Sequence, residues 1–229
     1  MNALIFAAGK GERMRPLTEH TPKPLLRAGG RMLIEWHLQK LADIGVQTVV
    51  INTSWQAECF EPALGSGSRW GLRLVYSYEG PEPLETGGGM AKALPHLGTS
   101  PFLAVNGDVF CGVDFSCLPS APKGLAHLLM VDNPEHNPHG DFALLGNGVL
   151  ASEGNQRLTF SGIGVYRPEL LLRCRPQWQQ PGVEHPRFKL APILRQAMHD
   201  GLISGAHYQG LWTDVGTPER LAALDASLA

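Results

Sequence analysis

The N-terminal segment constrains the fold of this chain more than any other part of the sequence. A uniformly apolar run covers residues 3–8, is too short for a helix and stops at Gly9. This pattern is typical of a strand that is buried on both faces of a parallel sheet. We therefore expect an α/β fold whose sheet contains the first strand of the chain.

The loop that follows this strand has the composition of an anion-binding turn. Gly9 and Gly11 permit positive φ and close approach of the backbone, so successive N–H groups can point at one anion. Lys10, Arg13 and Arg15 add three cations, and an arginine can pair bidentately with phosphate oxygens. We interpret the loop as a binding site for a nucleoside triphosphate.

Two other phosphate-binding loops do not fit the sequence. A P-loop requires Gly-x4-Gly-Lys-Ser/Thr, and no such run occurs. A dinucleotide-binding fingerprint requires a third glycine where the chain has Met14, and an acidic residue at the end of the second strand. That strand ends at Asn52 and Thr53, which excludes the dinucleotide-binding interpretation as well.

Composition narrows the class of protein further. The 229 residues are 43% hydrophobic and 17% charged, which is ordinary for one globular domain over residues 1–229. The net charge of -2 argues against a nucleic-acid or membrane partner, which would require a basic surface. The chain shows neither a signal-peptide pattern nor an apolar run of membrane-spanning length, so we expect a cytoplasmic protein with reduced cysteines.

Apolar periodicity predicts alternating strands and helices in the first half of the chain. A parallel sheet with right-handed crossovers follows from this order, and ligands bind at the carboxyl ends of such strands. Loops after Ala8, Glu79 and Asn106 should therefore open on one crevice. The predicted strands cover 3–8, 48–52, 72–78 and 102–106, and the predicted helices 32–44, 55–64 (broken near Pro62) and 86–94.

The second half of the chain has a less regular pattern. We expect a closing helix at 218–228, with Thr217 as N-cap and Pro218 as its first residue. A hairpin should pair 141–145 with 149–152 across two glycines. The remaining predicted elements are strands at 126–131, 159–166 and 203–208 and a helix at 189–199.

The order Gly9-x-Gly11-x-Arg13-Met14-x-Pro16-Leu17-Thr18, followed by Pro22-Lys23-Pro24-Leu25, closely resembles the signature of the sugar-phosphate nucleotidyltransferases. This resemblance implies a single Rossmann-like, GT-A-like domain with a mostly parallel mixed sheet flanked by helices. It also implies transfer of a nucleotide from a nucleoside triphosphate to a sugar 1-phosphate, with release of pyrophosphate. Residues 1–110 would bind the nucleotide and residues 111–229 the sugar phosphate. Arg13 and Lys23 would be the catalytic cations.

Such a reaction joins two polyanions, which calls for Mg²⁺ held by carboxylates at strand ends. Asp108 directly follows a predicted buried strand, and Asp214 precedes the last helix. Both lie in segments that resemble family motifs, Gly-Asp and Trp-x-Asp-x-Gly-Thr. The resemblance therefore assigns Asp108 and Asp214 as ligands of a magnesium ion.

The resemblance also assigns the substrate-binding residues. The family's Glu-Lys-Pro lysine is missing from this chain, and we expect Lys189 to take its place at the sugar phosphate. His136 and His139 lie in a proline-containing loop and are expected to be solvated. The nucleotide-binding set comprises Ala7, Ala8, Gly9, Gly11, Arg13, Glu79, Gly88 and Asn106, and the sugar-phosphate set Asn106, Gly140, Asp141, Ser161, Gly162 and Lys189.

The choice of substrates depends on resemblance within the family. Segments near Val131, Phe160 and Phe188 resemble the uridylyltransferases of peptidoglycan recycling, which implies UTP. A mannose- or heptose-1-phosphate guanylyltransferase and a glucose-1-phosphate thymidylyltransferase remain alternatives. A non-catalytic regulatory subunit is disfavoured because Arg13, Lys23, Asp108 and Asp214 are all present. The expected assembly is a monomer or a small homo-oligomer.

Overall fold

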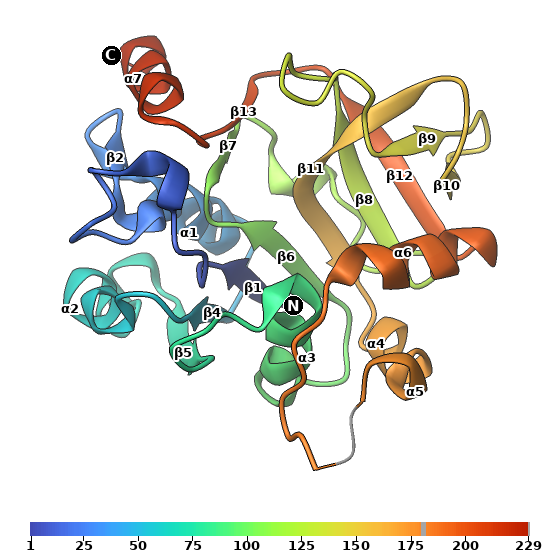
Figure 1. Ribbon diagram of the computed structural model, residues 1–229, viewed down its shortest axis with the longest axis horizontal. Helices are drawn as coiled ribbons and strands as arrows, with labels where there is room; N and C mark the ends of the chain where they lie inside the picture. The colour runs from blue at the N-terminus through green and yellow to red at the C-terminus, as the bar shows by residue number, and fades with distance from the viewer. Residues whose placement is uncertain (180–181, 229) are drawn as a thin grey trace.

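The computed structural model describes residues 1–179 and 182–228 (Figure 1). Within these residues, nine strands form one mixed sheet, which confirms the expected α/β class. The order of its parallel strands is β5-β4-β1-β6. The chain thus adds β4 and β5 on one side of β1 and then returns to add β6 on the other side. These strands are β1 (Asn2–Phe6), β4 (Thr48–Thr53), β5 (Arg73–Tyr78) and β6 (Phe102–Asn106), within two residues of the predicted boundaries.

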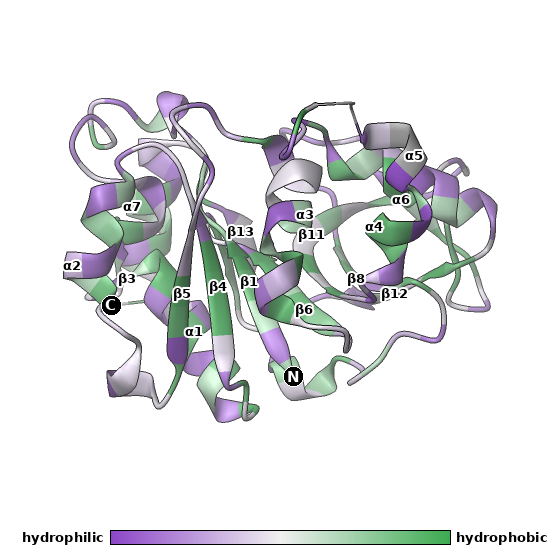
Figure 2. Ribbon diagram, turned by 90° about the horizontal axis from the view of Figure 1, so that it is seen from below, coloured by the Kyte–Doolittle hydropathy of each residue, from purple (hydrophilic) through white to green (hydrophobic). Residues whose placement is uncertain are grey.

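Alternating side chains on these strands build two separate cores. Ala3 and Ile5 of β1 pack with α1 (Leu33–Asp43) and α2 (Phe60–Leu64) on one face of the sheet. Leu4 packs with α3 (Glu85–Leu97) on the other face. The central strands are accordingly hydrophobic along their length (Figure 2).

The structure corrects two predicted helices. Pro62 does not break its helix but lies inside the short α2, where a proline in the first turn removes no helical hydrogen bond. α3 does not end near Leu94 but continues through Pro95 to Leu97.

The second half of the chain extends the same sheet with mostly antiparallel pairs. β11 (Arg157–Tyr166) pairs antiparallel with β6 and continues the sheet to β8 (Ala126–Val131) and β12 (Ile203–Tyr208). The predicted hairpin is present as β9 (Phe142–Leu144) and β10 (Leu150–Ala151). α6 (Leu190–His199) packs beside α3, and α4 (Glu169–Arg173) and α5 (Arg175–Trp178) lie nearby (Figure 1).

The C-terminal segment returns to the N-terminal half of the molecule. β13 (Trp212–Asp214) pairs antiparallel with β7 (Val109–Cys111), the strand that follows β6. α7 (Pro218–Ser227) then packs against the hairpin of β2 (Arg27–Ala28) and β3 (Arg31–Met32) (Figure 1). Its N-cap is as predicted, because the Thr217 side chain accepts a hydrogen bond from the Arg220 N–H. Among the described residues, no helix has the length and apolarity needed to cross a membrane.

Candidate active site

A cavity of about 720 Å³ opens at the carboxyl ends of the four parallel strands. This is the edge of the sheet at which the sequence predicts ligand binding, beside the strand where the connections reverse. The structure brings many of the predicted residues to this cavity from segments far apart in the chain. Its lining includes Ala7, Ala8, Gly9, Gly11, Arg13, Lys23, Glu79, Asn106 and Asp108.

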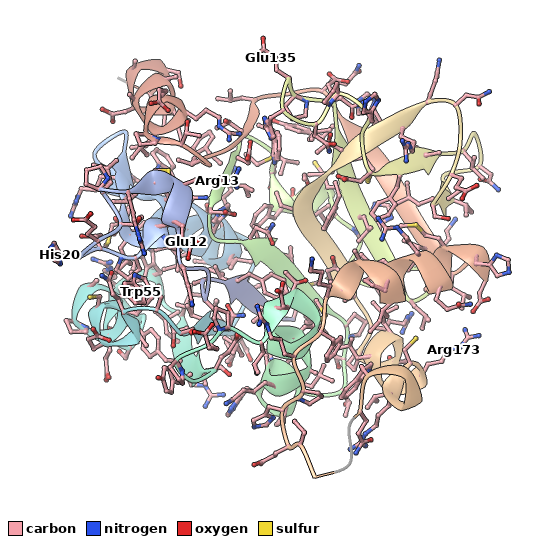
Figure 3. All side chains as sticks on the ribbon, viewed as in Figure 1. Glu12, Arg13, His20, Trp55, Glu135 and Arg173 are labelled. Atoms are coloured by element: carbon pink, nitrogen blue, oxygen red, sulfur yellow. The ribbon has the colours of Figure 1, made fainter. Side chains whose placement is uncertain are left out.

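The glycine loop is held in place by Met14 and Thr18, whereas the backbone at its first glycine, Gly9, is exposed. The Thr18 hydroxyl donates to the Gly11 carbonyl over 2.8 Å, and Gly11 has a φ of 63°. Met14 is fully buried in a small cluster that also contains Val215 of the C-terminal segment. A Cβ placed on Gly9 would meet no described protein atom within 4 Å, so the backbone at Gly9 is accessible from the cavity. Arg13 lies in the 3-10 turn Glu12–Met14 of this loop and lines the cavity (Figure 3).

Asn52 joins three strand ends at the floor of the cavity. Its side-chain oxygen accepts from the Ala7 N–H over 2.6 Å, and its amide donates to Glu79 over 2.6 Å. The second oxygen of Glu79 accepts from the Leu84 N–H over 2.7 Å. Burial raises the pKa of the Glu79 carboxyl, and these hydrogen bonds oppose that shift. Asn52 was not among the predicted site residues, because its contacts join strands that lie far apart in the sequence.

Three cations that line the cavity are each paired with a carboxylate from another segment. Lys23 is 7% exposed and is the most deeply buried of them. A polyanionic ligand would exchange these ion pairs for bonds to its own oxygens, so the charge is already in place before binding. The pairs are Lys10–Glu82 at 2.9 Å, Lys23–Asp108 at 2.7 Å and Arg187–Glu85 at 3.1 Å.

The two predicted metal ligands lie on adjacent segments. The Val215 N–H donates to the Asp108 carbonyl over 2.8 Å, which holds the backbone of Asp214 beside that of Asp108. The Asp214 carboxylate lies 2.5 Å from Arg220 and 3.1 Å from His136. His136 is exposed, as expected, with 41% of its side chain accessible, and its contact with Asp214 was not predicted. Glu135, next to it in the chain, projects outward at the tip of this loop (Figure 3).

This pair of carboxylates fits a magnesium site in chemistry and in placement. Mg²⁺ binds through one or two carboxylates and completes its shell with water and substrate phosphates. Within residues 1–179 and 182–228, no three His, Cys, Asp or Glu side chains gather as a metal cage. Asp108 lines the cavity, and Asp214 lies beside the lining residue Gly216.

The run of three glycines at the start of α3 is explained by three different neighbours. A Cβ on Gly87 would lie 2.4 Å from the Phe188 ring, and one on Gly89 would lie 2.3 Å from the Glu79 carboxylate. A Cβ on Gly88 would lie 2.6 Å from the Pro186 carbonyl. Gly88 thus faces the segment 186–190 and is not among the described residues that line the cavity. Its predicted contact with a base stays a prediction.

The segment 186–190 covers the N-terminus of α3 and carries one cation to the cavity. The Phe188 carbonyl accepts from the N–H groups of Gly87 and Gly88 over 3.0 and 3.1 Å. Arg187 from the same segment lines the cavity. Lys189 is exposed at the N-cap of α6 and is not among the described lining residues of this cavity. Its proposed role at the sugar phosphate also stays a prediction.

Ser161 and Gly162 of the predicted sugar-phosphate set lie on β11, beside the cavity-lining residue Asn106. Gly162 has a φ of 80°, and a Cβ there would lie 2.6 Å from the Asn106 amide. Asn106 therefore lies between the cavity, which it lines, and Gly162 on β11. Asp141 accepts from the Phe160 N–H over 2.8 Å, and the Ser161 carbonyl accepts from the Trp212 indole. Gly140, with a φ of 59°, packs against Asn133 and against the backbone of Arg157 at the start of β11.

Comparison with known proteins identifies relatives over the whole chain. The profile of the family described as "Nucleotidyl transferase" matches residues 2–229. The N-acetylmuramate alpha-1-phosphate uridylyltransferase of Neisseria meningitidis is 48% identical over 99% of this chain and 97% of its own length. The enzyme of the same description from Caulobacter vibrioides is 33% identical over 99% and 96%.

A solved structure shows the same fold. It is a candidate glucose-1-phosphate thymidylyltransferase from Bacillus anthracis in complex with sucrose, and it superimposes with a TM-score of 0.83. The match covers 100% of this chain and 95% of that one at 20% sequence identity. The likeness in fold at so low an identity indicates that the architecture tolerates wide divergence in sequence.

Proposed function

The chain belongs to the nucleotidyl transferase family, and from that premise we propose that it makes UDP-N-acetylmuramate and pyrophosphate from UTP and N-acetylmuramate α-1-phosphate. The observation that carries the nucleotidyl-transfer part is the cavity itself. It combines, at the carboxyl ends of parallel strands, an accessible glycine loop, four cations and five carboxylates, of which Asp108 follows β6. The choice of substrates is supported by the relative that is 48% identical over nearly the whole chain.

The reaction requires little covalent chemistry from the protein. An oxygen of the sugar phosphate, already anionic at neutral pH, attacks the α-phosphorus of UTP. The bond from that phosphorus to the bridging oxygen of the β-phosphate breaks, and pyrophosphate leaves with the electron pair. Catalysis then consists of positioning two polyanions and stabilising charge on the transferred group.

The residues divide this work according to their positions. The backbone of Gly9 and Gly11, with Arg13, binds the triphosphate. Lys23 exchanges its ion pair with Asp108 for a bond to the reacting phosphates. Glu79, whose carboxylate is held by Asn52 and the Leu84 N–H, would accept a hydrogen bond from the imino N–H of the base.

Asp108 and Asp214 are the residues that would hold Mg²⁺. When bound, this ion would neutralise phosphate charge and polarise the phosphorus–oxygen bonds. The ion pairs that the two aspartates form with Lys23 and Arg220 orient both carboxylates in the protein. Residues 1–110 would thus contribute most of the nucleotide site and residues 111–229 the sugar-phosphate site.

N-acetylmuramate carries a lactyl carboxylate in addition to its phosphate, so its site requires one more cation than that of a neutral sugar. Arg187 fits this requirement because it lines the cavity and its side chain is 59% exposed. Lys189, two residues further, remains the candidate for the sugar phosphate. Asn106, Gly140, Asp141, Ser161 and Gly162 complete the proposed sugar-phosphate site.

A guanylyltransferase or thymidylyltransferase is the alternative within the family. The Glu79 carboxylate can accept a hydrogen bond from the imino N–H of uracil, thymine or guanine, so this contact does not select among the three bases. A panel of pyrophosphate-release assays separates the possibilities. UTP, dTTP, GTP and ATP would each be combined with N-acetylmuramate 1-phosphate, mannose 1-phosphate and glucose 1-phosphate, with and without Mg²⁺.

We expect release to be fastest with UTP and N-acetylmuramate 1-phosphate and to require Mg²⁺. A higher kcat/KM for GTP with mannose 1-phosphate, or for dTTP with glucose 1-phosphate, would replace the proposed substrates by that pair. Absence of release with every pair, from a protein that still binds UTP, would instead indicate a regulatory subunit.

A further inference from the structure

A second cavity lies on the surface away from the strand ends. It has a volume of about 510 Å³ and is formed by the β2–β3 hairpin, the first turns of α1 and the segment 63–70. It shares no described lining residue with the candidate active site. Nothing in the proposed reaction uses it.

Three arginines give this second cavity a positive charge. Arg27, Arg31 and Arg69 line it, and Glu35 is the one carboxylate among its described lining residues. Both Glu35 oxygens are already engaged, one by the Met32 N–H at 2.7 Å and the other by Arg69 at 3.0 Å. In residues 1–179 and 182–228, Arg27 and Arg31 form no ion pair with a carboxylate. The local excess of two positive charges contrasts with the net charge of -2 for the chain.

Two of the guanidinium groups are held in place by aromatic rings. Arg69 stacks on Trp70 with its Cζ 3.9 Å from the ring centroid, and Arg31 lies 5.1 Å from that of Trp36. The Trp36 indole is fixed in turn by a 3.1 Å hydrogen bond to the Ala28 carbonyl. Stacking uses the face of a guanidinium and not its N–H groups, which can pair with a planar or tetrahedral oxyanion. Arg69 already donates from Nη2 to Glu35 and Ala63, and Arg27 from Nη1 to the Gly30 carbonyl, so an oxyanion would bind through their remaining N–H groups and through Arg31.

We propose that this arginine cavity binds a phosphorylated small molecule and that its occupancy regulates the active site. Phosphate and diphosphate groups match the chemistry, because each oxyanion can accept two parallel N–H bonds from one guanidinium. The volume suffices for a ligand larger than phosphate itself, since small-molecule sites begin at about 300 Å³.

The helix α1 connects the arginine cavity to the active site. Glu35 and Gln39 of α1 line the cavity, whereas His37 on the same helix donates from Nε2 to the Val109 carbonyl over 2.8 Å. Lys40 of α1 donates to the carbonyl of Cys111, the last residue of β7, and over 2.8 Å to that of Val113 just beyond it. α1 thus holds the strand that begins directly after Asp108. A ligand that draws Arg31 and the N-terminus of α1 together would act on that strand through these bonds.

Binding can be measured on the full chain by NMR titration with inorganic pyrophosphate, using the tryptophan indole N–H signals. Trp36 and Trp70 report on the arginine cavity. The indoles of Trp55 and Trp212 donate to the carbonyls of Thr18 and Ser161 and report on the active site, whereas Trp178, whose indole donates to the Leu171 carbonyl, serves as the internal reference. We expect saturable shifts of the Trp36 and Trp70 signals that persist in Arg13→Ala, which weakens the active site. The double variant Arg31→Ala/Arg69→Ala should weaken this binding about tenfold or more.

Two further variants control this experiment. Arg173→Ala removes an exposed arginine on α4 that pairs with Asp200, and it should leave the titration unchanged. Arg31→Gln keeps the Arg69–Glu35 ion pair, so it should fold and still weaken binding about threefold or more. If pyrophosphate does not shift the Trp36 and Trp70 signals, or shifts them with equal affinity in the wild type and Arg31→Gln, the proposed site is overturned.

The regulatory effect is tested with inorganic phosphate in the pyrophosphate-release assay at saturating substrates. Phosphate should change kcat in the wild type and in Arg173→Ala but not in Arg31→Gln, whose kcat without phosphate stays as in the wild type. A phosphate effect confined to KM, or equal in all three proteins, would contradict communication through α1.

Discussion

The ammonium group of Lys23 lies 2.7 Å from a carboxylate oxygen of Asp108, although 85 residues separate them in the chain. Lys23 is buried, whereas the Asp108 side chain is 40% exposed toward the cavity. The pair joins the 3-10 turn Lys23–Leu25, which follows the glycine loop, to the strand end that would bind the metal. The same lysine can therefore neutralise Asp108 before substrates bind and phosphate oxygens afterwards.

Replacing Lys23 by methionine should impair chemistry more than folding. We expect kcat to fall about 10²–10³-fold, the range for removal of one preorganised donor to a transition state. Asp108 remains partly solvated in this variant, so thermal unfolding should shift little. Steady-state kinetics and a melting curve test both statements, with Arg173→Ala as the matched control. Wild-type kcat in Lys23→Met would remove Lys23 from the mechanism.

Alanine should lower the stability of the fold at Gly89, whereas at Gly9 it should raise the KM for UTP and leave stability nearly unchanged. A Cβ on Gly89 would lie 2.3 Å from Glu79 and 2.6 Å from Asn52, and such overpacking costs about 1–3 kcal/mol. The higher helix propensity of alanine offsets up to about 1 kcal/mol of this cost. Gly89→Ala should therefore unfold at lower urea concentration and bind UTP more weakly.

Gly9→Ala provides the comparison. Its Cβ would meet no described protein atom within 4 Å, so the free energy of unfolding should change by about 0.5 kcal/mol or less. The same methyl group enters the space assigned to the triphosphate, and the KM for UTP should rise. An unaltered KM for UTP in Gly9→Ala would show that the loop does not contact the nucleotide.

His37 should make the fold sensitive to acid. It is fully buried, and desolvation is the main cause that lowers its pKa from 6.5 to about 4. Between these values the unfolded chain binds a proton at this site that the folded chain does not, so stability falls as the pH falls. His37 contributes at most about 1.4 kcal/mol per pH unit to the slope of the unfolding free energy against pH. This slope is confined to the window between about pH 4 and pH 6.5, and above pH 6.5 the full stability is present.

The variant His37→Gln isolates this contribution. Urea unfolding of both proteins from pH 4 to pH 7 should show a steeper loss of stability for the wild type, whatever the absolute stability of the variant. Equal slopes for the two proteins would mean that His37 is not held neutral in the folded state.

Local sequence patterns predicted much of the fold because they report local physics. The apolar run before Gly9 identified β1, periodicity identified α1 within one residue at each end, and Thr217 identified the start of α7. Pairing of β13 with β7 was not predicted, since three-residue strands carry no periodicity of their own. Yet that pairing brings Asp214 beside Asp108.

The candidate site was predictable where a residue follows a strand, and not where a contact depends on tertiary packing. Ala8, Glu79 and Asn106 reach one cavity because their strands are parallel neighbours. Asn52 was placed there by side-chain contacts that no local pattern encodes. Gly88 faces Pro186 for the same reason, because the segment 186–190 folds back over α3 from a hundred residues further along the chain.

The account depends most on one divalent ion shared by Asp108 and Asp214 beside the glycine loop. Crystals grown with UTP and Mn²⁺ would locate that ion by its anomalous scattering. We predict one peak in contact with both carboxylates and with phosphate oxygens, at roughly 2.0–2.2 Å from each oxygen, and its loss in Asp214→Asn. A peak that contacts neither aspartate, or a triphosphate bound away from Gly9 and Gly11, would contradict the assignment.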